Sequence, residues 1–191
     1  MRRDLVVNSA LAIFALTVLF GLAYPLLTTG VAQVLFPNKS DGSQLTRDGK
    51  TVGSSLIAQD FGSDRAFFHP RTSQTDFNGA ATAFNNLGPN SEELSDQLKK
   101  RRAAYMHQEQ LRPGEEVPVD AVTGSASGVD PHISKANARI QARRVADSRG
   151  MPLEEVLDMV DVHTDGRGLG VLGEPGVNVL ELNLALDKEA S

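Results

Sequence analysis

The stretch LVVNSALAIFALTVLFGLAYPLL, which begins at Leu5 and ends at Leu27, decides how this chain is organised. It contains no charged side chain. A helix rises about 1.5 Å per residue, so the stretch spans about 34 Å, enough to cross a hydrocarbon core of ~30 Å. Tyr24 lies near its far end, where aromatic rings favour the membrane interface, and Pro25 is expected in the last turns, where proline is tolerated. The sequence therefore predicts a transmembrane helix.

A cleaved secretory signal is the alternative for this segment. The small residues Gly30 and Ala32 would suit a signal peptidase that cuts before Gln33. However, the apolar run is longer than the roughly 7–15 residues of a signal h-region, which favours a retained anchor. Both alternatives export the same domain.

The charges that flank the helix predict its orientation. Arg2 and Arg3 precede it, and no Lys or Arg occurs from Leu5 through Asn38. The positive-inside rule therefore places the N-terminus in the cytoplasm and the rest of the chain outside it. We expect an N-terminus and transmembrane helix over residues 1–27, a membrane exit segment over 28–36 and a soluble accessory domain over 37–191.

The composition of that domain excludes several classes of function. Arg2, Arg3 and Asp4 are the charged residues of positions 1–36, so the domain carries the acidity behind the chain's net charge of −5. An acidic surface is a poor partner for nucleic acid, which needs a basic one. The chain has 0 cysteines, which excludes disulfides and thiolate metal sites. Its fold class is predicted as α+β: one N-terminal transmembrane helix followed by a single mixed α/β extracytoplasmic domain.

Local signals predict the elements of the domain. Asp48-Gly49 lies between two strand-like runs and indicates a hairpin turn. Ser91 is expected to cap a helix in which Leu94, Leu98 and Tyr105 share a face, and Asp96 is expected to pair with Lys100. We interpret residues 62–91 as a long loop held by aromatic anchors, which are Phe67, Phe68, Phe77 and Phe84.

The C-terminal third predicts two helices and a strand. Ser134 should cap a helix over residues 135–149 that Gly150 ends, with Ala138, Ala142 and Val145 buried and Arg139, Arg143 and Arg144 largely off that stripe. Another helix should start near Pro152 and bury Leu153, Val156, Leu157 and Val160. The alternation of Leu180, Leu182, Leu184 and Leu186 with polar or small residues predicts a half-buried strand, with a bulge over 177–179.

Motifs for catalysis or metal binding are weak. Gly42 and Gly49-Lys50-Thr51 have the wrong spacing for a phosphate-binding loop. Ser127, Asp130 and His132 are sequence neighbours, which rarely converge as a triad. The four histidines are scattered, and His163 with Asp161 and Asp165 is a weak cluster. The turn over residues 124–128 suits a tight turn better than an anion site. We expect a domain that binds, positions or stabilises partners and has no active site of its own.

Seven segments, read in order, resemble one family. They are FPNKSDGS (36–43), VGSSLIAQDF (52–61), FFHPRTS (67–73), NNLGPN (85–90), VTGSASGVDPHIS (122–134), ARIQARRVADSRG (138–150) and GEPGVNVLELNLALDK (173–188). Behind one N-terminal helix, this order is similar to the C subunit of the Kdp potassium-transporting ATPase, a bacterial high-affinity K⁺ uptake system.

The resemblance implies a subunit of a heteromeric complex in the bacterial inner membrane. The implied partners are a channel-like K⁺-binding subunit, a P-type ATPase subunit that hydrolyses ATP and a small membrane subunit. The implied role is to stabilise the complex and support transport. The family has also been proposed to act as a catalytic chaperone that raises the ATP affinity of the ATPase subunit through a glutamine, and Gln141 matches that position.

The predicted orientation conflicts with direct ATP contact at Gln141, because ATP is cytoplasmic. We therefore expect no cofactor of the chain's own, and an effect on ATP affinity would travel through the complex as a coupling between distant sites. Three hypotheses follow: a non-catalytic accessory subunit, which we favour, a nucleotide-binding protein on the cytoplasmic side, and an anchored hydrolase that uses Ser127 or His132.

Overall fold

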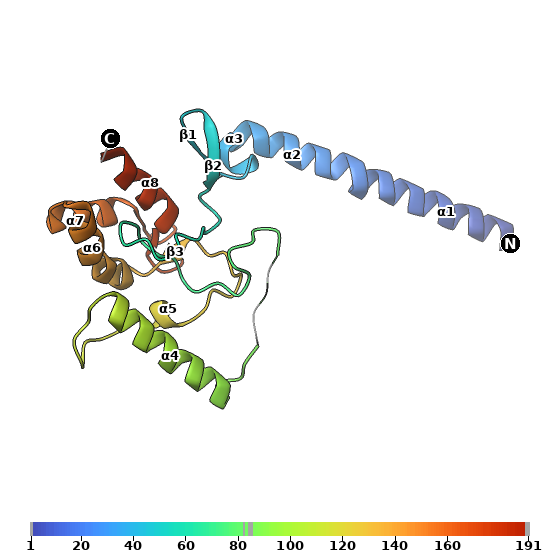
Figure 1. Cartoon of the computed structure of the whole chain (residues 1–191). Helices are drawn as coiled ribbons and strands as arrows, with labels where there is room; N and C mark the ends of the chain where they lie inside the picture. Colours follow the sequence, from blue (N-terminus) through green and yellow to red (C-terminus); the bar gives the residue numbers. More distant parts are fainter. Residues whose placement is uncertain (1, 82, 84–85, 190–191) are drawn as a thin grey trace. The chain divides into compact units, whose positions relative to one another are not determined.

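A computed structural model describes residues 2–81, 83 and 86–189, in which helices predominate and the strands are short (Figure 1). The chain divides into two compact units, Met1–Gln44 and Leu45–Ser191. The predicted class, an N-terminal apolar helix followed by an α/β domain, is confirmed. In chain order the elements are α1 (Arg2–Val18), the π-helix η1 (Leu19–Ala23), α2 (Tyr24–Leu35), α3 (Pro37–Ser40), β1 (Gln44–Arg47), β2 (Lys50–Ser54), α4 (Glu92–Gln108), α5 (Val119–Val122), β3 (His132–Ile133), α6 (Lys135–Arg149), α7 (Leu153–Val162), β4 (Thr164–Asp165), β5 (Gly176–Asn178) and α8 (Val179–Glu189).

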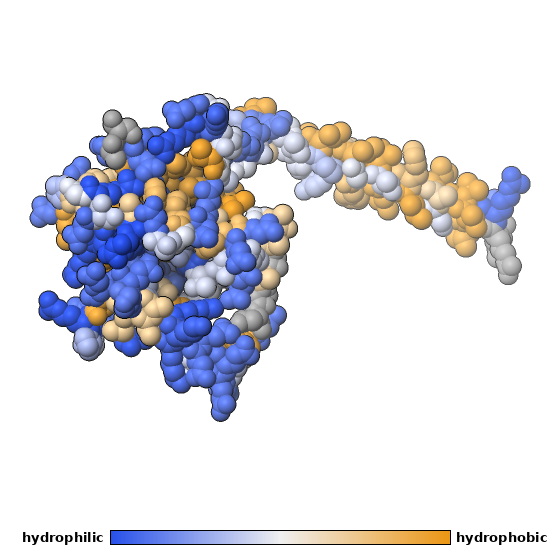
Figure 2. Space-filling view, viewed as in Figure 1, coloured by the Kyte–Doolittle hydropathy of each residue, from blue (hydrophilic) through white to orange (hydrophobic). Residues whose placement is uncertain are grey.

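The first unit is dominated by one long apolar helix that joins α1, η1 and α2. It runs over Arg3–Leu35, 33 residues with a mean hydropathy of 2.3, and is long and apolar enough to cross a membrane. Hydrophobic side chains cover much of its visible surface (Figure 2). The predicted span from Leu5 to Leu27 lies inside this helix, and most of the predicted exit segment continues it.

A wider, π-helical turn accommodates Pro25 in the helix. Pro25 has no N–H and cannot bond to the carbonyl of Gly21, which would be its normal helical partner. The π turn η1 comes directly before it, and the N–H of Tyr24 bonds to the carbonyl of Leu19. The expectation that Pro25 lies in the last turns is wrong, because the helix continues to Leu35. Wide turns of this kind are a usual way to relieve a local defect inside a helix.

The β1–β2 hairpin is confirmed. Its turn residues, Asp48 and Gly49, have φ values of 51° and 74°. Positive φ at both central positions defines the type I′ turn, whose twist matches that of paired strands. Lys50 and Thr51 therefore lie in a strand. This accounts for the sequence that partly matches a phosphate-binding loop.

The core of the second unit forms between α6, α7, α8 and a small antiparallel sheet. The sheet has the strand order β3–β5–β4, and Val177 in its middle strand pairs with Ile133 on one side and Thr164 on the other. The buried apolar cluster draws on all of these elements, and its residues are Phe68, Ile133, Ala138, Ala142, Val145, Ala146, Val156, Val160, Val177, Val179, Leu182 and Leu186. Burial of such side chains is the main driving force for folding.

Helix α6 matches its prediction closely. The Ser134 hydroxyl accepts a hydrogen bond from the Asn137 N–H at 3.1 Å, which caps the first turn. Gly150 ends the helix in the left-handed conformation, with φ of 66°. The predicted stripe of Ala138, Ala142 and Val145 is fully buried.

Helices α4 and α7 begin where the caps indicated, with small differences. Ser91 accepts from the Leu94 N–H, so the predicted cap of α4 is confirmed. Asp96 pairs with Lys99 at 3.1 Å, not with Lys100. In α7, Val156 and Val160 are buried, whereas Leu153 is exposed.

The predicted C-terminal strand with its bulge is wrong. Strand β5 ends at Asn178, and α8 begins at Val179. Val179, Leu182 and Leu186 are buried together, and their spacing of three and four residues is helical. The Asn178 carboxamide oxygen accepts from the Glu181 N–H at 3.2 Å, which satisfies a donor of the first turn. The leucine alternation also fits a strand, so the period alone did not distinguish the two structures.

The loop over residues 62–91 is held by aromatic side chains in its first part. Phe68 is buried in the core. The ring of Phe67 lies 5.3 Å from that of Phe61, and the Arg149 guanidinium lies 4.8 Å above the Phe67 ring. Phe77 is half-buried, and Phe84 lies outside the described residues. The anchor prediction is confirmed for Phe67 and Phe68.

Candidate functional site

Gln141, the residue that the family resemblance indicated, lies at the centre of a buried polar cluster on α6. Its side chain is 2% exposed. The carboxamide oxygen accepts from the His69 N–H at 2.8 Å and from Arg144 Nη2 at 3.0 Å. The amide nitrogen donates to the His69 carbonyl at 3.0 Å and to Asn137 Oδ1 at 2.9 Å. Two acceptor and two donor positions are the full capacity of a glutamine, so a ligand would have to displace one of these partners.

Arg144 forms the second part of the cluster. Its Nε donates to both carboxylate oxygens of Glu109 at 3.0 Å, and its Nη1 donates to the carbonyls of Arg65 and Phe67 at 2.8 and 2.9 Å. The prediction that Arg144 lies off the buried stripe is wrong, because this ion pair lets the charge be buried. Burial raises the pKa of Glu109, and the Arg144 charge opposes that shift. The pair joins α6 to the end of α4.

Asn137 extends the cluster toward α4 and α5. The Tyr105 hydroxyl donates to Asn137 Oδ1 at 2.8 Å, and Asn137 Nδ2 donates to Asp120 Oδ2 at 2.9 Å. Asp120 also accepts from the N–H and the hydroxyl of Ser134 at 2.8 and 2.7 Å. Burial raises the pKa of Tyr105, and the Glu109 charge adds to the shift. Tyr105 is therefore a hydrogen-bond donor at neutral pH.

His69 closes the cluster on its loop side. Gln108 Nε2 donates to His69 Nδ1 at 2.6 Å, and His69 Nε2 donates to the Asp64 carbonyl at 2.9 Å. Burial lowers the pKa of His69, and the nearby Arg144 charge lowers it further. The ring is therefore held neutral, in the tautomer that carries its proton on Nε2.

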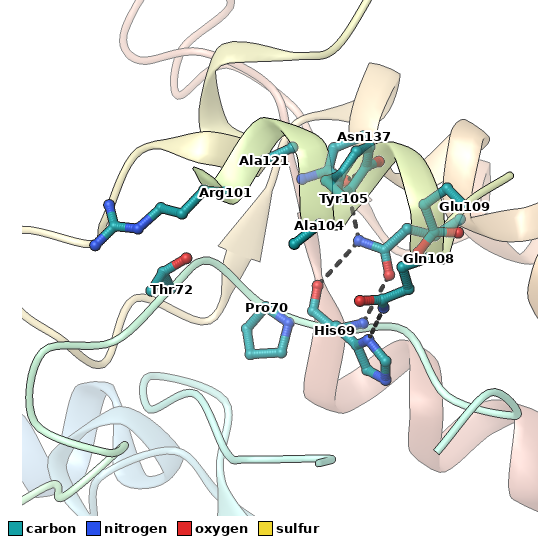
Figure 3. A pocket seen from close by; sticks show the side chains of 11 residues that line it. His69, Pro70, Thr72, Arg101, Ala104, Tyr105, Gln108, Glu109, Ala121 and Asn137 are labelled. Atoms are coloured by element: carbon teal, nitrogen blue, oxygen red, sulfur yellow. Dashed lines mark hydrogen bonds between the residues drawn. The ribbon is translucent and has the colours of Figure 1, made fainter. Parts of the chain in front are cut away.

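A cavity of ≈ 190 Å³ opens beside this cluster (Figure 3). Its lining mixes polar and apolar groups, from His69, Pro70, Thr72, Arg101, Ala104, Tyr105, Gln108, Glu109, Ala121, Asn137 and Gln141. Pockets for drug-sized ligands measure about 300–1,000 Å³, so this one suits water or a small polar group. The polar atoms of Gln141 at its wall are already bonded within the chain.

The geometry does not bring Ser127, Asp130 and His132 together as a triad. The Ser127 hydroxyl pairs with Ser125 Oγ at 3.2 Å and accepts from the Val129 N–H at 3.2 Å. His132 Nε2 lies 2.9 Å from Asp165 Oδ2, and its Nδ1 lies 3.6 Å from Asp130 Oδ1. The carboxylates of Asp130 and then of Asp165 raise the pKa of His132. This arrangement stabilises an imidazolium and leaves it no hydrogen bond to a nucleophile within the described residues.

The weak cluster around His163 is also dispersed. His163 Nδ1 lies 2.8 Å from the Met159 carbonyl, and Asp161 pairs with Lys135 at 2.9 Å. Asp165 pairs with His132 instead. Among the residues that the structure describes, no group of three or more His, Asp or Glu side chains is placed to hold a metal ion.

The turn over residues 124–128 is filled by the chain itself. The Ser125 N–H donates to the Thr72 carbonyl at 2.9 Å, and the Ser125 hydroxyl accepts from the N–H groups of Gly128 and Asp130 at 3.1 and 3.2 Å. The Ser73 hydroxyl donates to the Gly128 carbonyl at 2.6 Å. The N–H groups of Ser125 and Gly128 are thus bonded within the chain, which favours the tight-turn interpretation.

Sequence reasoning missed most of the buried cluster, although one signal was present. Asn137, Gln141 and Arg144 recur at helical spacing, which places them on one face of α6 beside the alanine stripe. A polar stripe next to an apolar one indicates buried polar groups that need partners. The partners themselves come from elsewhere: Tyr105 lies on α4, and Glu109 follows its last residue.

Comparisons with known proteins agree over nearly the whole length. A family model described as KdpC, the K⁺-transporting ATPase, c chain, matches residues 6–188. A protein of Rhodospirillum rubrum named potassium-transporting ATPase KdpC subunit is 50% identical over 184 residues, which cover 94% of this chain and 93% of the relative. Subunits of the same name from Mycobacterium bovis and Cereibacter sphaeroides are 45% identical over 190 residues (98% of this chain, 100% of the relative) and 47% over 176 (92% of each).

Proposed function

The chain belongs to the KdpC family, the c chain of the K⁺-transporting ATPase, and on this premise we propose that it is a non-catalytic accessory subunit that stabilises the complex. Its helix would dock against partner helices in the bacterial inner membrane. Its domain would support transport by the subunits that bind K⁺ and hydrolyse ATP, namely a channel-like subunit and a P-type ATPase subunit, together with a small membrane subunit.

One observation carries this proposal: the apolar side chains of the N-terminal helix are exposed, whereas the polar side chains around Gln141 are buried in the domain. The helix over Arg3–Leu35 is 0% buried within the chain, so lipid or partner helices must cover it. In the domain, the polar side chains around Gln141 are turned inward and bonded to one another. Such a domain supplies a rigid body, which suits an assembly role.

A shallow, open groove on α2 supports docking of the helix against another helix. It is lined by Leu26, Leu27, Gly30, Val31, Val34 and Leu35. A Cβ added at Gly30 would meet nothing within 4 Å. Small residues let helices approach closely in membranes, where packing drives association.

The proposed orientation keeps the N-terminus in the cytoplasm and the domain outside. It is supported by Arg2 and Arg3 before the helix and by the lack of Lys or Arg from Leu5 through Asn38. In this orientation the domain is separated from cytoplasmic ATP. We propose that Gln141 positions the loop around His69, and that any effect of the chain on ATP affinity is transmitted through the complex.

The test is to purify the transport ATPase from cells that express or lack this chain. The proposal predicts that omission lowers the yield of assembled complex and its K⁺-stimulated ATP hydrolysis. Unchanged assembly and transport without the chain would refute it. Direct ATP contact is tested separately, because photolabelling of this chain by an azido-ATP probe in the intact complex would favour the nucleotide-binding alternative.

A further inference from the structure

The loop between β4 and β5 presents apolar side chains to solvent. We call residues 168–172 the apolar loop. Leu169, Val171 and Leu172 in it are 93%, 74% and 62% exposed. Single exposed aliphatic residues are common on protein surfaces, whereas several within one short loop form an apolar patch, which is a candidate interaction site.

This exposure belongs to an ordered turn. The N–H groups of Gly168 and Leu172 each bond to the other residue's carbonyl at 2.8 Å. Below the turn, Arg167 Nη2 donates to both carboxylate oxygens of Glu174 at 2.9 and 2.8 Å. These bonds close the turn, and the leucine and valine side chains on it face solvent.

The backbone of the loop adds a second unfavourable feature. Leu169 has φ of 52°, in the left-handed region that glycine favours and that leucine rarely adopts. Gly170 follows with φ of 79°. The chain therefore holds its most exposed leucine in a strained conformation. Strained positions of this kind cluster at binding sites and switch regions, so the conformation of Leu169 supports a binding role for the loop.

The charge of the surrounding segment decides between possible occupants. From Met151 to Pro175 its carboxylates belong to Glu154, Glu155, Asp158, Asp161, Asp165 and Glu174, and Arg167 is its single Lys or Arg. Asp161 pairs with Lys135, Asp165 with His132 and Glu174 with Arg167, so the net negative charge comes from the three other carboxylates, which lie on α7. An anionic membrane surface attracts basic segments and repels this one. A second copy of the chain would bring two acidic segments together, which is unfavourable. The segment also lacks the Trp and Tyr residues that favour the membrane interface.

We propose that the apolar loop inserts into an apolar recess, edged by basic side chains, on another subunit of the transport ATPase. This proposal rests on the proposed function, since it assigns the docking element of an accessory subunit. Burial of the apolar side chains drives the contact, and the acidic segment around them selects the partner by charge.

The absence of cysteine from the chain allows a direct test by thiol labelling. Leu169→Cys introduces the chain's single thiol, and its reaction with a maleimide is followed on the gel band of this chain. The rate is compared for the chain alone in detergent, the chain alone in anionic vesicles and the assembled complex. We expect labelling to be at least about tenfold slower in the complex, a protection of about 1.4 kcal/mol, with no slowing in the other samples.

Val119→Cys is the matched control, because Val119 on α5 is 73% exposed. It should label at one rate in all samples. Equal rates for Leu169→Cys alone and in the complex would overturn the proposal, as would equal protection of both sites. Protection in vesicles alone would assign the loop to lipid, and protection that grows with chain concentration would assign it to a second copy; both contradict the proposal.

A double variant separates this proposal from the proposed function. Leu169→Ser with Val171→Ser changes exposed side chains, so its unfolding midpoint should match the wild type, while K⁺-stimulated ATP hydrolysis of the complex should fall at least twofold. If omitting the chain is harmful but the double variant is fully active, the docking proposal alone fails. If omission is harmless, the proposed function fails.

Discussion

Arg144 on α6 and Glu109, which follows the last residue of α4, form an ion pair whose side chains are 2% and 0% exposed. Both carboxylate oxygens lie 3.0 Å from Arg144 Nε. The two residues are 35 positions apart in the chain. Because each charge is withdrawn from water, each depends on the other, and the position of α4 against α6 depends on both.

Loss of one partner of this pair should be costly. We expect Arg144→Met to lower the free energy of unfolding of the full chain in detergent by about 3–5 kcal/mol, because Glu109 is left buried and unpaired. Arg143→Met is the matched control on the exposed side of α6, with an expected effect within about 0.5 kcal/mol. Equal effects of the two changes in denaturant unfolding would contradict the structural role of the pair.

Gln141→Ala should act on stability and leave nucleotide affinity unchanged. The change removes the partners of the half-buried N–H and carbonyl of His69, at a cost of about 1 kcal/mol for each hydrogen bond lost. Unfolding of the chain and the KM for ATP of the assembled complex are the two measurements. A raised KM with unchanged stability would instead support the family's ATP role for Gln141.

His132 should make stability depend on pH. Its pKa is raised in the folded chain by Asp130 and Asp165, so its stabilising contribution is present below the unfolded value of about 6.5 and is lost as pH rises through the folded pKa. NMR titration of the full chain in micelles should give a pKa above that value. His132→Asn should abolish this loss between about pH 6.5 and the folded pKa, and an unchanged pH profile would refute the assignment.

His69 should make stability depend on pH in the opposite direction to His132. Burial lowers its pKa, so stability is present above about pH 6.5 and falls as pH drops toward the folded pKa, because the unfolded chain takes up the proton first. We expect the imidazole signals of His69 to titrate below the ordinary histidine pKa of about 6.5. Titration of His69 at or above that value would contradict a buried neutral ring.

The groove at Gly30 predicts a specific effect on assembly. Gly30→Leu fills the groove, so the amount of chain that co-purifies with the complex should fall severalfold. Ala12→Leu is the control, because it introduces the same leucine side chain at an exposed position of the same apolar helix. Equal recovery of the two variants would argue against packing at Gly30.

Local sequence signals correctly predicted the helices whose ends carry capping residues. Ser91, Ser134 and Gly150 act where their side chains or backbone freedom indicated, because capping depends on a few adjacent residues. The burial of the alanine stripe of α6 was predicted from the helical spacing of its apolar residues alone. The apolar helix followed from its length and lack of charge.

The failures share a cause in contacts that are distant in sequence. Arg144 was expected off the buried stripe, because no signal near it in the sequence indicates that Glu109 is its partner. The segment after Asn178 fits both periods, and packing against α6 and α7 selects the helix. The family resemblance identified Gln141 as a candidate residue. That all of its hydrogen-bonding positions are occupied within the chain could be seen only in the folded structure.

The proposed function depends on the domain lying outside the cytoplasm, and the side of the membrane on which it lies can be measured directly. Val119→Cys in an otherwise cysteine-free chain would be labelled by a membrane-impermeant maleimide in intact spheroplasts and again after lysis. We expect equal labelling before and after lysis, because the proposed orientation puts the domain outside. Labelling that appears only after lysis would place the domain beside ATP and contradict this orientation.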